Sequence, residues 1–319
     1  MKHLSKDSAT WHEVDPEAAG QRVDNYLTKR LKGVPKSHIY RILRSGEVRI
    51  NSRRIGPDYR VQPGDRLRLP PVRTAKPASA SKHPPASRLK ANVLYEDDAL
   101  LVIDKPSGTA VHGGSGVSHG VIGQLRLERP EARFLELVHR LDRDTSGVLM
   151  LAKRRSALIE LHRQLREGQV QKFYHALVKG AWRDGKRSVN LPLHKYVLTS
   201  GERRVSVGSE GLPAHTVFRL QRALGSYSLL EAELKTGRTH QIRVHLAHVG
   251  YPITGDDKYG DFTLNKQLAK QGLKRMFLHA ARAVIHHPQG GAALTFEAPL
   301  PPDLRKFLDV LEAGKTGIA

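Results

Sequence analysis

Apolar residues near the N-terminus recur at helical spacing in two short runs: Val23, Tyr26, Leu27 and Leu31, then Ile39, Ile42 and Leu43. This spacing predicts two consecutive helices, the second capped by Ser37 and ended by Gly46. Alternating residues follow in V-R-I, before an Asn51-Ser52 turn, and in R-L-R-L, after a Gly64-Asp65 turn. The pattern predicts a small α+β module of two helices and a short sheet.

From residue 91 onward, strand patterns outnumber helical ones. V-L-Y-E-D-D-A-L-L-V-I-D predicts two strands around an acidic turn, and V-L-M-L-A, F-Y-H-A-L-V, H-T-V-F-R-L and L-L-E-A-E-L are further strand candidates. Two helices are expected, one capped by Ser156 and one opened by Thr239. Strands without regular intervening helices favour an α+β domain on a mixed, mostly antiparallel sheet with flanking helices, rather than a Rossmann or barrel fold.

The stretch between these parts, residues 74–90, is rich in Pro, Ala, Ser and Lys and contains almost nothing to bury. Such a composition predicts an extended linker. We therefore expect an N-terminal tail over 1–18, a small module over 19–73 and a larger domain over 91–319.

The charge of the chain indicates what kind of partner it binds. Lys and Arg number 53 against 31 Asp and Glu, a net charge of +22. Residues 20–73 contain fourteen of these cations and only four carboxylates. This balance favours a polyanion, and nucleic acid first, over a small neutral or acidic molecule. A phosphate-binding surface is expected on the polar sides of the module, at Lys36, Arg41, Arg44, Arg53 and Arg54.

The chain has no Cys, so it can form no disulfide, thiolate metal site or Cys nucleophile. It also lacks an apolar stretch of signal-peptide length or of the roughly 18 residues that a membrane span needs. We expect a cytoplasmic protein without a membrane or metal partner.

The most informative segment, V-H-R-L-D-R-D-T-S-G-V-L-M-L-A-K over 138–153, places a crowded polar turn between two apolar strands. Taken alone, it is typical of a turn held by Asx-type hydrogen bonds, with a carboxylate paired to an arginine. Two other motifs are weaker still. G-x-S-x-G over 116–120 lacks the preceding strand of a hydrolase nucleophile elbow, and His240, His245 and His248 lack the H-E-x-x-H spacing of a zinc site.

The 138–153 segment is one of five motifs that occur in a fixed order along the chain. The other four are D-K-P-S-G-T-A-V-H, K-F-Y-H-A-L-V, K-T-G-R-T-H-Q-I-R-V-H-L and G-D-D-K-Y-G. The set resembles the RluA-type family of pseudouridine synthases over residues 91–312. Likewise D-N-Y-L followed by S-x-I-Y-R-I-L-R-x-G-x-V-R-I-N resembles the alpha-L RNA-binding module known from a ribosomal protein of the small subunit.

The resemblance implies an isomerase that converts uridine to pseudouridine with no cofactor and no metal. It implies that Asp142 is the catalytic carboxylate, that Arg243 pairs with it and that Tyr174 stacks on the uracil. It assigns Arg140 to the extrusion or positioning of the nucleotide. Stretches such as E-A-R-F-L-E-L-V-H-R-L-D-R-D-T-S-G-V-L are closer still to members that modify the large ribosomal subunit.

The expected partner is accordingly 23S ribosomal RNA or a large-subunit assembly intermediate, bound by a monomer. The alternative is a protein on the same fold that holds ribosomal RNA during assembly without modifying it. The presence of Asp142, Tyr174 and Arg243 together favours the enzyme.

Overall fold

The computed structural model describes residues 8–316 apart from 32, 73–90, 114–119 and 200. The chain divides into two compact units, Met1–Pro85 and Ala86–Ala319, and each is described by itself. The predicted linker over 74–90 and the G-x-S-x-G residues 116–119 lie outside the described residues. Among the described helices, none combines the length and apolar character needed to cross a membrane.

In the N-terminal unit, two helices pack against a four-stranded antiparallel sheet of order β1-β4-β2-β3. Leu27, Ile39 and Leu67 are among the fully buried side chains of its core. The elements are β1 (Thr10–Glu13), η1 (Pro16–Ala18), α1 (Val23–Arg30), α2 (Lys36–Arg44), β2 (Arg49–Ile50), β3 (Arg53–Arg54) and β4 (Arg66–Leu69). The two predicted helices and the short sheet are confirmed.

The structure differs from the sequence-based expectation at the start of this unit. Thr10–Glu13, which the pattern assigned to a tail, forms the edge strand β1 by pairing with β4. His12 is buried on the inner side of this strand, whereas Trp11 and Glu13 are exposed on the outer side. Four residues are too few for a periodic signal, and only the pairing with β4, more than fifty residues later, makes them a strand.

None of the three predicted helix caps is correct. Helix α2 starts two residues earlier than expected, because Pro35 takes the cap position with an extended backbone, and Ser37 lies inside the first turn. Ser156 likewise lies inside α4 (Arg155–Arg166), whose cap position is Arg154. Helix α5 (Gln241–His248) is preceded by His240 in a left-handed conformation rather than capped by Thr239.

The C-terminal unit is built on a ten-stranded sheet whose main path runs β10-β13-β14-β9-β15-β8-β6-β5. Only β15 and β8 run parallel, and β7 and β16 pair with β8 and β15 outside the main path. Strands β11 (Leu193–Val197) and β12 (Arg203–Val207) form a separate hairpin. The remaining strands are β5 (Asn92–Glu96), β6 (Leu100–Lys105), β7 (Glu136–Leu137), β8 (Ser146–Ala152), β9 (Gln171–Lys179), β10 (Lys186–Asn190), β13 (His215–Leu224), β14 (Tyr227–Leu234), β15 (Leu278–His286) and β16 (Ala293–Glu297).

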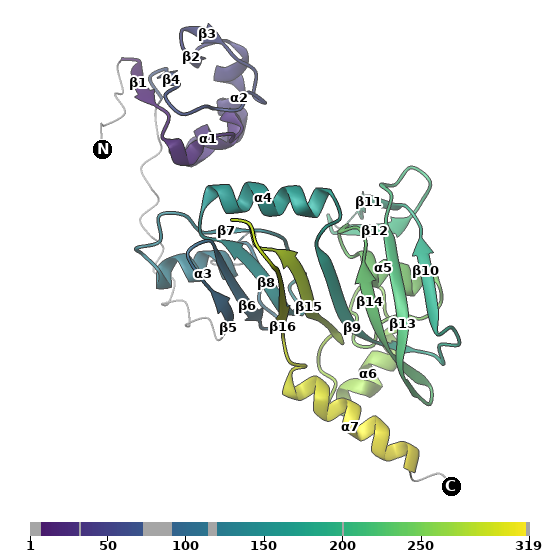
Figure 1. Ribbon diagram of the computed structural model, residues 1–319. Helices are drawn as coiled ribbons and strands as arrows, with labels where there is room; N and C mark the ends of the chain where they lie inside the picture. Colours follow the sequence, from purple (N-terminus) through teal and green to yellow (C-terminus); the bar gives the residue numbers. More distant parts are fainter. Residues whose placement is uncertain (1–7, 32, 73–90, 114–119, 200, 317–319) are drawn as a thin grey trace. The chain divides into compact units, whose positions relative to one another are not determined.

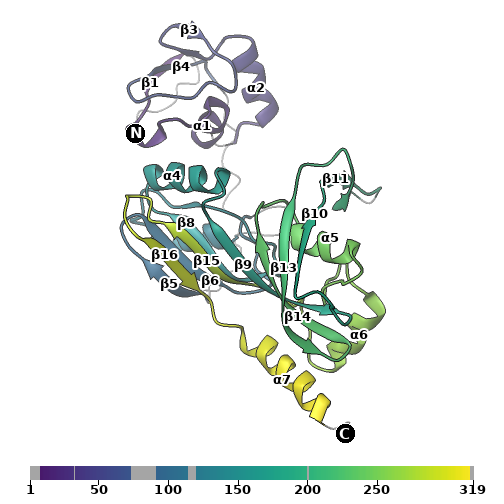
Figure 2. The same cartoon turned by 45° about the vertical axis from the view of Figure 1, so that its right-hand side comes forward.

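Both faces of this sheet are covered by helices (Figures 1 and 2). Alternate residues of β6 and β8 enter different cores: Leu149 joins the cluster under α3 (Val121–Glu128) and α5, and Met150 joins the cluster under α4. Helices α6 (Phe262–Lys270) and α7 (Pro302–Thr316) cover a third cluster that includes Leu177 of β9. Strands buried on both sides explain why their sequences are continuous apolar runs. The predicted α+β class on a mixed, mostly antiparallel sheet is confirmed.

Candidate active site

A cavity of about 1040 Å³ opens in the C-terminal unit, and the predicted catalytic residues line it. Its walls are the loop over 138–145 between β7 and β8, the start of β9, and residues 234–243 from the end of β14 into α5. The structure therefore brings together segments that lie far apart in the chain. Asp142, Tyr174, Arg243 and Arg140 all contribute to this lining.

Arg243 is the centre of the charged groups in the cavity and is only 4% exposed. Its Nη1 donates to Asp142 Oδ2 at 3.1 Å, while its Nε and Nη2 donate to the two oxygens of Asp256 at 2.7 Å each. Burial alone would raise the pKa of Asp256, but the bonds from Arg243 hold that pKa below its usual value. The buried carboxylate of Asp256 thus fixes the orientation of the guanidinium, which donates a hydrogen bond from Nη1 to Asp142.

Asp142 differs from Asp256 in its surroundings. Its side chain is 26% exposed, to the cavity, whereas that of Asp256 is completely buried. Asp256 also accepts the backbone N–H groups of Lys258 and Tyr259 at 2.8 and 3.0 Å. Asp256 therefore has its hydrogen-bonding capacity filled by the protein, and Asp142 keeps an oxygen that a ligand can reach.

The loop that carries Asp142 is held by side chains from other segments. The buried Lys105 Nζ donates to the carbonyls of Pro106, Thr109 and Arg143 at 2.8 to 3.0 Å, and burial lowers the pKa of Lys105 to about 7. Ser107 Oγ donates to the Asp144 carbonyl at 2.8 Å. These contacts bind the D-K-P-S-G segment to the Asp142 loop, which gives that motif a positioning role.

Gly147, directly after this loop, lies against the backbone of the parallel strand β15. Its φ is 108°, and a Cβ atom would lie 2.2 Å from the carbonyl oxygen of Ala280. Only glycine fits this approach. The T-S-G part of the motif therefore fixes where β8 begins, and with it the position of the loop.

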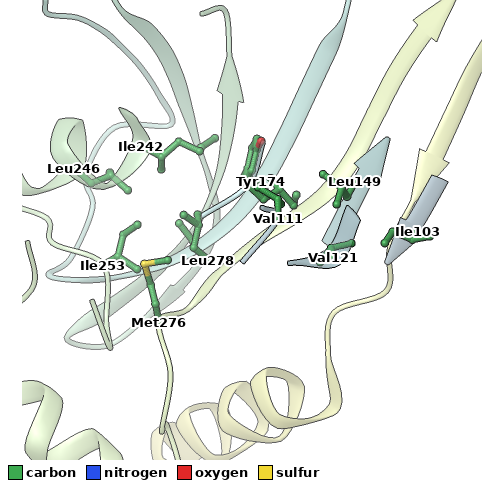
Figure 3. Close-up of a cluster of buried hydrophobic side chains, with 14 of the residues drawn as sticks. Ile103, Val111, Val121, Leu149, Tyr174, Ile242, Leu246, Ile253, Met276 and Leu278 are labelled. Carbon is green, nitrogen blue, oxygen red and sulfur yellow. The ribbon is translucent and has the colours of Figure 1, made fainter. Parts of the chain in front are cut away.

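Tyr174 lies on β9 and is 6% exposed. Its ring belongs to the apolar cluster that includes Ile242 and Leu278, and Figure 3 shows it among these side chains. Burial, and secondarily the charge of Asp142, raises the pKa of its hydroxyl well above the usual value. The hydroxyl therefore stays protonated beside the cavity, and the ring supplies an apolar wall.

Arg140 is exposed and lines the same cavity as Asp142. The two residues do not share a strand face, as the spacing suggested, because 138–145 is a loop. The preceding His139 accepts a hydrogen bond from the Met150 backbone N–H at 3.2 Å, and burial lowers its pKa to about 3. His139 is thus a neutral side chain that attaches the loop to β8, consistent with a structural role.

The sequence analysis did not single out Lys172 or Tyr259, and it considered His240 only as a metal ligand. Lys172, two residues before Tyr174, lines the cavity, and burial lowers the pKa of its ammonium group to about 8. His240 Nε2 lies 3.8 Å from Asp142 Oδ1, and its Nδ1 lies 2.8 Å from the Tyr259 hydroxyl. All three lie inside the motifs K-F-Y, R-T-H and K-Y-G, so the motifs located them, but the sequence gives no sign of which side chains face the cavity.

The suggested histidine metal site is not assembled. His245 is buried, where its ring contacts the Thr216 hydroxyl at 2.9 Å and the Leu191 carbonyl at 3.0 Å, while His248 is exposed. Throughout the described residues, no group of three or more His, Cys, Asp or Glu side chains is arranged to hold a metal ion.

In the N-terminal unit, Lys36, Arg41 and Arg44 lie on the exposed side of α2. Arg53 and Arg54 are consecutive residues of β3 and therefore point to opposite faces of the sheet, so the five predicted cations do not share one face. Arg54 pairs with Arg49, and Arg49 with Arg68.

Across the outer sheet face, the strand register thus places Trp11, Arg68, Arg49 and Arg54 in one row. Trp11 is 44% exposed, and the guanidinium of Arg66 lies 5.6 Å from its ring centre. Arg54, Arg49 and Arg68 donate to the carbonyls of Ser45, Gly46 and Glu47, respectively. An exposed aromatic ring beside a row of guanidinium groups is typical of a nucleic-acid-binding surface.

Comparison with known proteins agrees with this geometry. Residues 99–248 match the family model described as RNA pseudouridylate synthase, and residues 21–67 match the S4 domain. Ribosomal large subunit pseudouridine synthase C of Salmonella typhi is 54% identical over 305 residues, which cover 94% of this chain and 96% of that protein. The chain belongs to the RNA pseudouridylate synthase family.

Other members of this family match over a similar extent. The proteins of the same name from Escherichia coli strain K12 and Pasteurella multocida are 53% and 52% identical, over 93% and 95% of this chain and 95% and 94% of their own lengths. Among solved structures, Human RNA Pseudouridylate Synthase Domain Containing 4 superposes with a TM-score of 0.57 and 26% identity, covering 69% of this chain and 93% of that one. The predicted family and enzyme class, an RNA pseudouridine synthase, are confirmed.

Proposed function

We propose that this protein isomerises several specific uridines of 23S ribosomal RNA to pseudouridine, with Asp142 as the catalytic carboxylate. The observation that carries the proposal is the arrangement of charges. Asp256 fixes the orientation of Arg243, and Arg243 Nη1 donates to Asp142, whose carboxylate lines the cavity. The names of the curated relatives support the large subunit as the source of the substrate.

The reaction is an isomerisation. The bond between ribose and N1 breaks, the uracil turns over, and carbon five joins the ribose, so that carbon five loses a proton and N1 gains one. No water, metal or redox step enters this balance. The step needs one carboxylate beside the anomeric carbon, and the hydrogen bond from the guanidinium of Arg243 orients that of Asp142.

The remaining groups of the cavity are assigned by the same chemistry. The Tyr174 ring, which lines the cavity, offers a stacking surface for the extruded uracil, and its hydroxyl stays protonated. Arg140, exposed at the cavity, is suited to contact the gap in the RNA from which the nucleotide has been extruded. Apolar side chains such as Leu278 line the cavity and reduce access of water to the detached base.

We assign RNA binding to the module over 19–73, extended by strand β1, and catalysis to residues 91–319. Lys36, Arg41 and Arg44 on α2, Arg53 and Arg54 on β3, and the Trp11 row offer cations and one aromatic platform to RNA. The substrate is naked 23S RNA or a large-subunit assembly intermediate, which implies a cytoplasmic protein. We expect it to act as a monomer.

The decisive experiment maps pseudouridine in 23S RNA from cells with and without this gene, using a probe that leaves a stop at each modified base. We expect the loss of several discrete sites, restored by the wild-type gene but not by Asp142→Asn. Restoration by Asp142→Asn would overturn the catalytic assignment. Loss of no site would favour the second candidate, a protein that binds ribosomal RNA without modifying it.

A further inference from the structure

We propose that His240 is a positioning residue, which donates its Nε2–H to the second carboxylate oxygen of Asp142, and that Tyr259 fixes the tautomer this requires. The inference rests on the proposed function of Asp142. It adds a second support for the carboxylate, at the oxygen that Arg243 does not bind, and a connection from the cavity to the hairpin β11–β12.

The backbone at His240 is the first observation. Its φ of 53° and ψ of 21° place a non-glycine residue in the left-handed region, directly before α5. Few non-glycine residues adopt this conformation, although histidine does so more often than most, and such strain persists only where the surrounding contacts enforce it. This conformation accompanies a ring placed between Tyr259 and Asp142, whereas Ser, Thr, Asn or Asp would serve better as a simple helix cap.

The hydrogen bonds of Tyr259 favour one tautomer of the His240 ring. The backbone N–H of Val205 donates to the Tyr259 hydroxyl oxygen at 3.0 Å. The hydroxyl proton is then free to point at His240 Nδ1, 2.8 Å away, which accepts it. A neutral histidine that accepts at Nδ1 carries its proton on Nε2. The Nε2–H therefore faces Asp142.

The two oxygens of Asp142 have different neighbours. Arg243 Nη1 donates to Oδ2 at 3.1 Å, and His240 Nε2 lies 3.8 Å from Oδ1. The second distance exceeds that of a hydrogen bond, and such contacts commonly shorten once substrate occupies a site. Burial lowers the pKa of His240, and the nearby cations Arg243 and Lys258 act in the same direction against Asp142 and Asp256. The ring is therefore a neutral donor, which leaves the charge balance with Arg243 unchanged.

The same geometry connects the cavity to the hairpin. Besides the bond from Val205, Arg204 Nη1 donates to the Lys258 carbonyl at 2.7 Å, and Lys258 Nζ pairs with Glu202 at 2.6 Å. The Tyr259 ring also packs 5.1 Å from the Arg243 guanidinium. Strand β12 thus sets the position of Tyr259, and Tyr259 sets the orientation of the His240 ring.

The test uses the full-length protein and a double-mutant cycle. His240→Asn suits a left-handed backbone but is too short to reach Asp142, and Tyr259→Phe keeps the ring on Arg243 and removes only the hydroxyl. We expect His240→Asn to lower kcat by roughly 10-fold to 100-fold, comparable to losing a hydrogen-bonded partner behind a reactive ligand. KM for the RNA should stay within about twofold, because Arg140 and the exposed cations assigned to RNA binding are unchanged.

Tyr259→Phe should lower kcat less, and the double variant should be no slower than His240→Asn alone, because Tyr259 acts through His240. Tyr251→Phe, on a ring that packs against Trp182, is the matched control and should keep wild-type kcat. Wild-type kcat in His240→Asn, or fully additive losses in the cycle, would overturn the inference. If Asp142→Asn is inactive in the same assay, the proposed function stands in either case; if it is active, that function fails first.

Discussion

Positive charge is used differently in the two units of this protein. On the N-terminal unit, Lys36, Arg41 and Arg44 lie exposed along α2, and the only carboxylate that pairs with them among the described residues is Glu47, on Arg41. In the cavity, Arg243 is buried and binds three carboxylates, those of Asp142, Asp256 and Asp257. Exposed cations add affinity for a polyanion nearly independently of one another, whereas a buried, paired cation determines orientation and acts as part of a unit. The comparison predicts where salt, acid and substitution will act.

The largest effect is expected at Asp142. Asp142→Asn keeps the shape of the side chain but replaces the carboxylate with an amide, so product formation should fall by roughly 10²-fold to 10⁴-fold. RNA affinity should change by less than about threefold, or about 0.7 kcal/mol. Single-turnover product formation and a binding isotherm on the same RNA measure the two quantities. The exposed Asp184→Asn should change neither; a parallel loss of binding in Asp142→Asn would contradict the separation of the two units' roles.

Salt should act on the N-terminal unit. If its surface makes six phosphate contacts, full-length affinity should fall by roughly 10³-fold between 50 and 200 mM salt. Replacing Lys36, Arg41 and Arg44 with Gln should reduce the slope of log affinity against log salt by about one for each cation that touches a phosphate. An unchanged slope would mean that α2 does not contact the RNA.

Arg243→Lys should destabilise the protein. One ammonium group cannot reach Asp142 while also pairing with both oxygens of Asp256, so a buried carboxylate loses its partner. We expect a loss of about 3 to 5 kcal/mol in the free energy of unfolding of the C-terminal unit, measured by urea denaturation. Arg222→Lys, at an exposed pair with Glu312, should cost less than about 1 kcal/mol. Equal losses in the two variants would refute the distinction between buried and exposed cations.

Acid should act on the buried polar groups beside the cavity. His279 is fully buried, with its ring between Ser146 Oγ and the Ala298 carbonyl, and burial lowers its pKa to about 4 from an ordinary 6.5. Between these values the unfolded chain binds the proton and the folded chain does not, so stability falls as pH is lowered, by about 3 kcal/mol in total. His279→Gln should be less stable at neutral pH but show a flatter dependence from pH 6.5 to 4. An unaltered pH dependence would assign the acid sensitivity elsewhere.

The smallest effect is expected at Trp11. Trp11→Ala should weaken RNA binding by about 1 to 3 kcal/mol, the contribution of one stacked base, without changing the salt slope. Fluorescence provides a direct measurement, because the chain has two tryptophans and the other, Trp182, is only 4% exposed. Binding of RNA should quench the wild-type emission and leave that of Trp11→Ala nearly unchanged. Equal quenching in both proteins would exclude stacking on Trp11.

Much of this molecule was predictable where the signal is local. The apolar spacing at Val23 to Leu31 and at Ile39 to Leu43 located α1 and α2, because a helix must bury one face. The runs around Asp97 and Asp98 located β5 and β6, because their strands are bounded by turn residues. Strand β1 and the caps of α2, α4 and α5 were missed, since a four-residue edge strand and a helix start depend on neighbours that the local sequence does not specify.

At the site, the sequence alone specifies which residue types are available: a carboxylate at 142, an aromatic ring at 174 and a guanidinium at 243, in ordered motifs that resemble one family. The packing of the folded chain is needed to see that Asp256, rather than Asp257, is the buried partner of Arg243, and that His240 lies near Asp142. Neighbouring carboxylates have the same chemistry in a sequence. Their burial, and therefore their protonation and hydrogen bonding, depends on which strands and loops the fold packs around them.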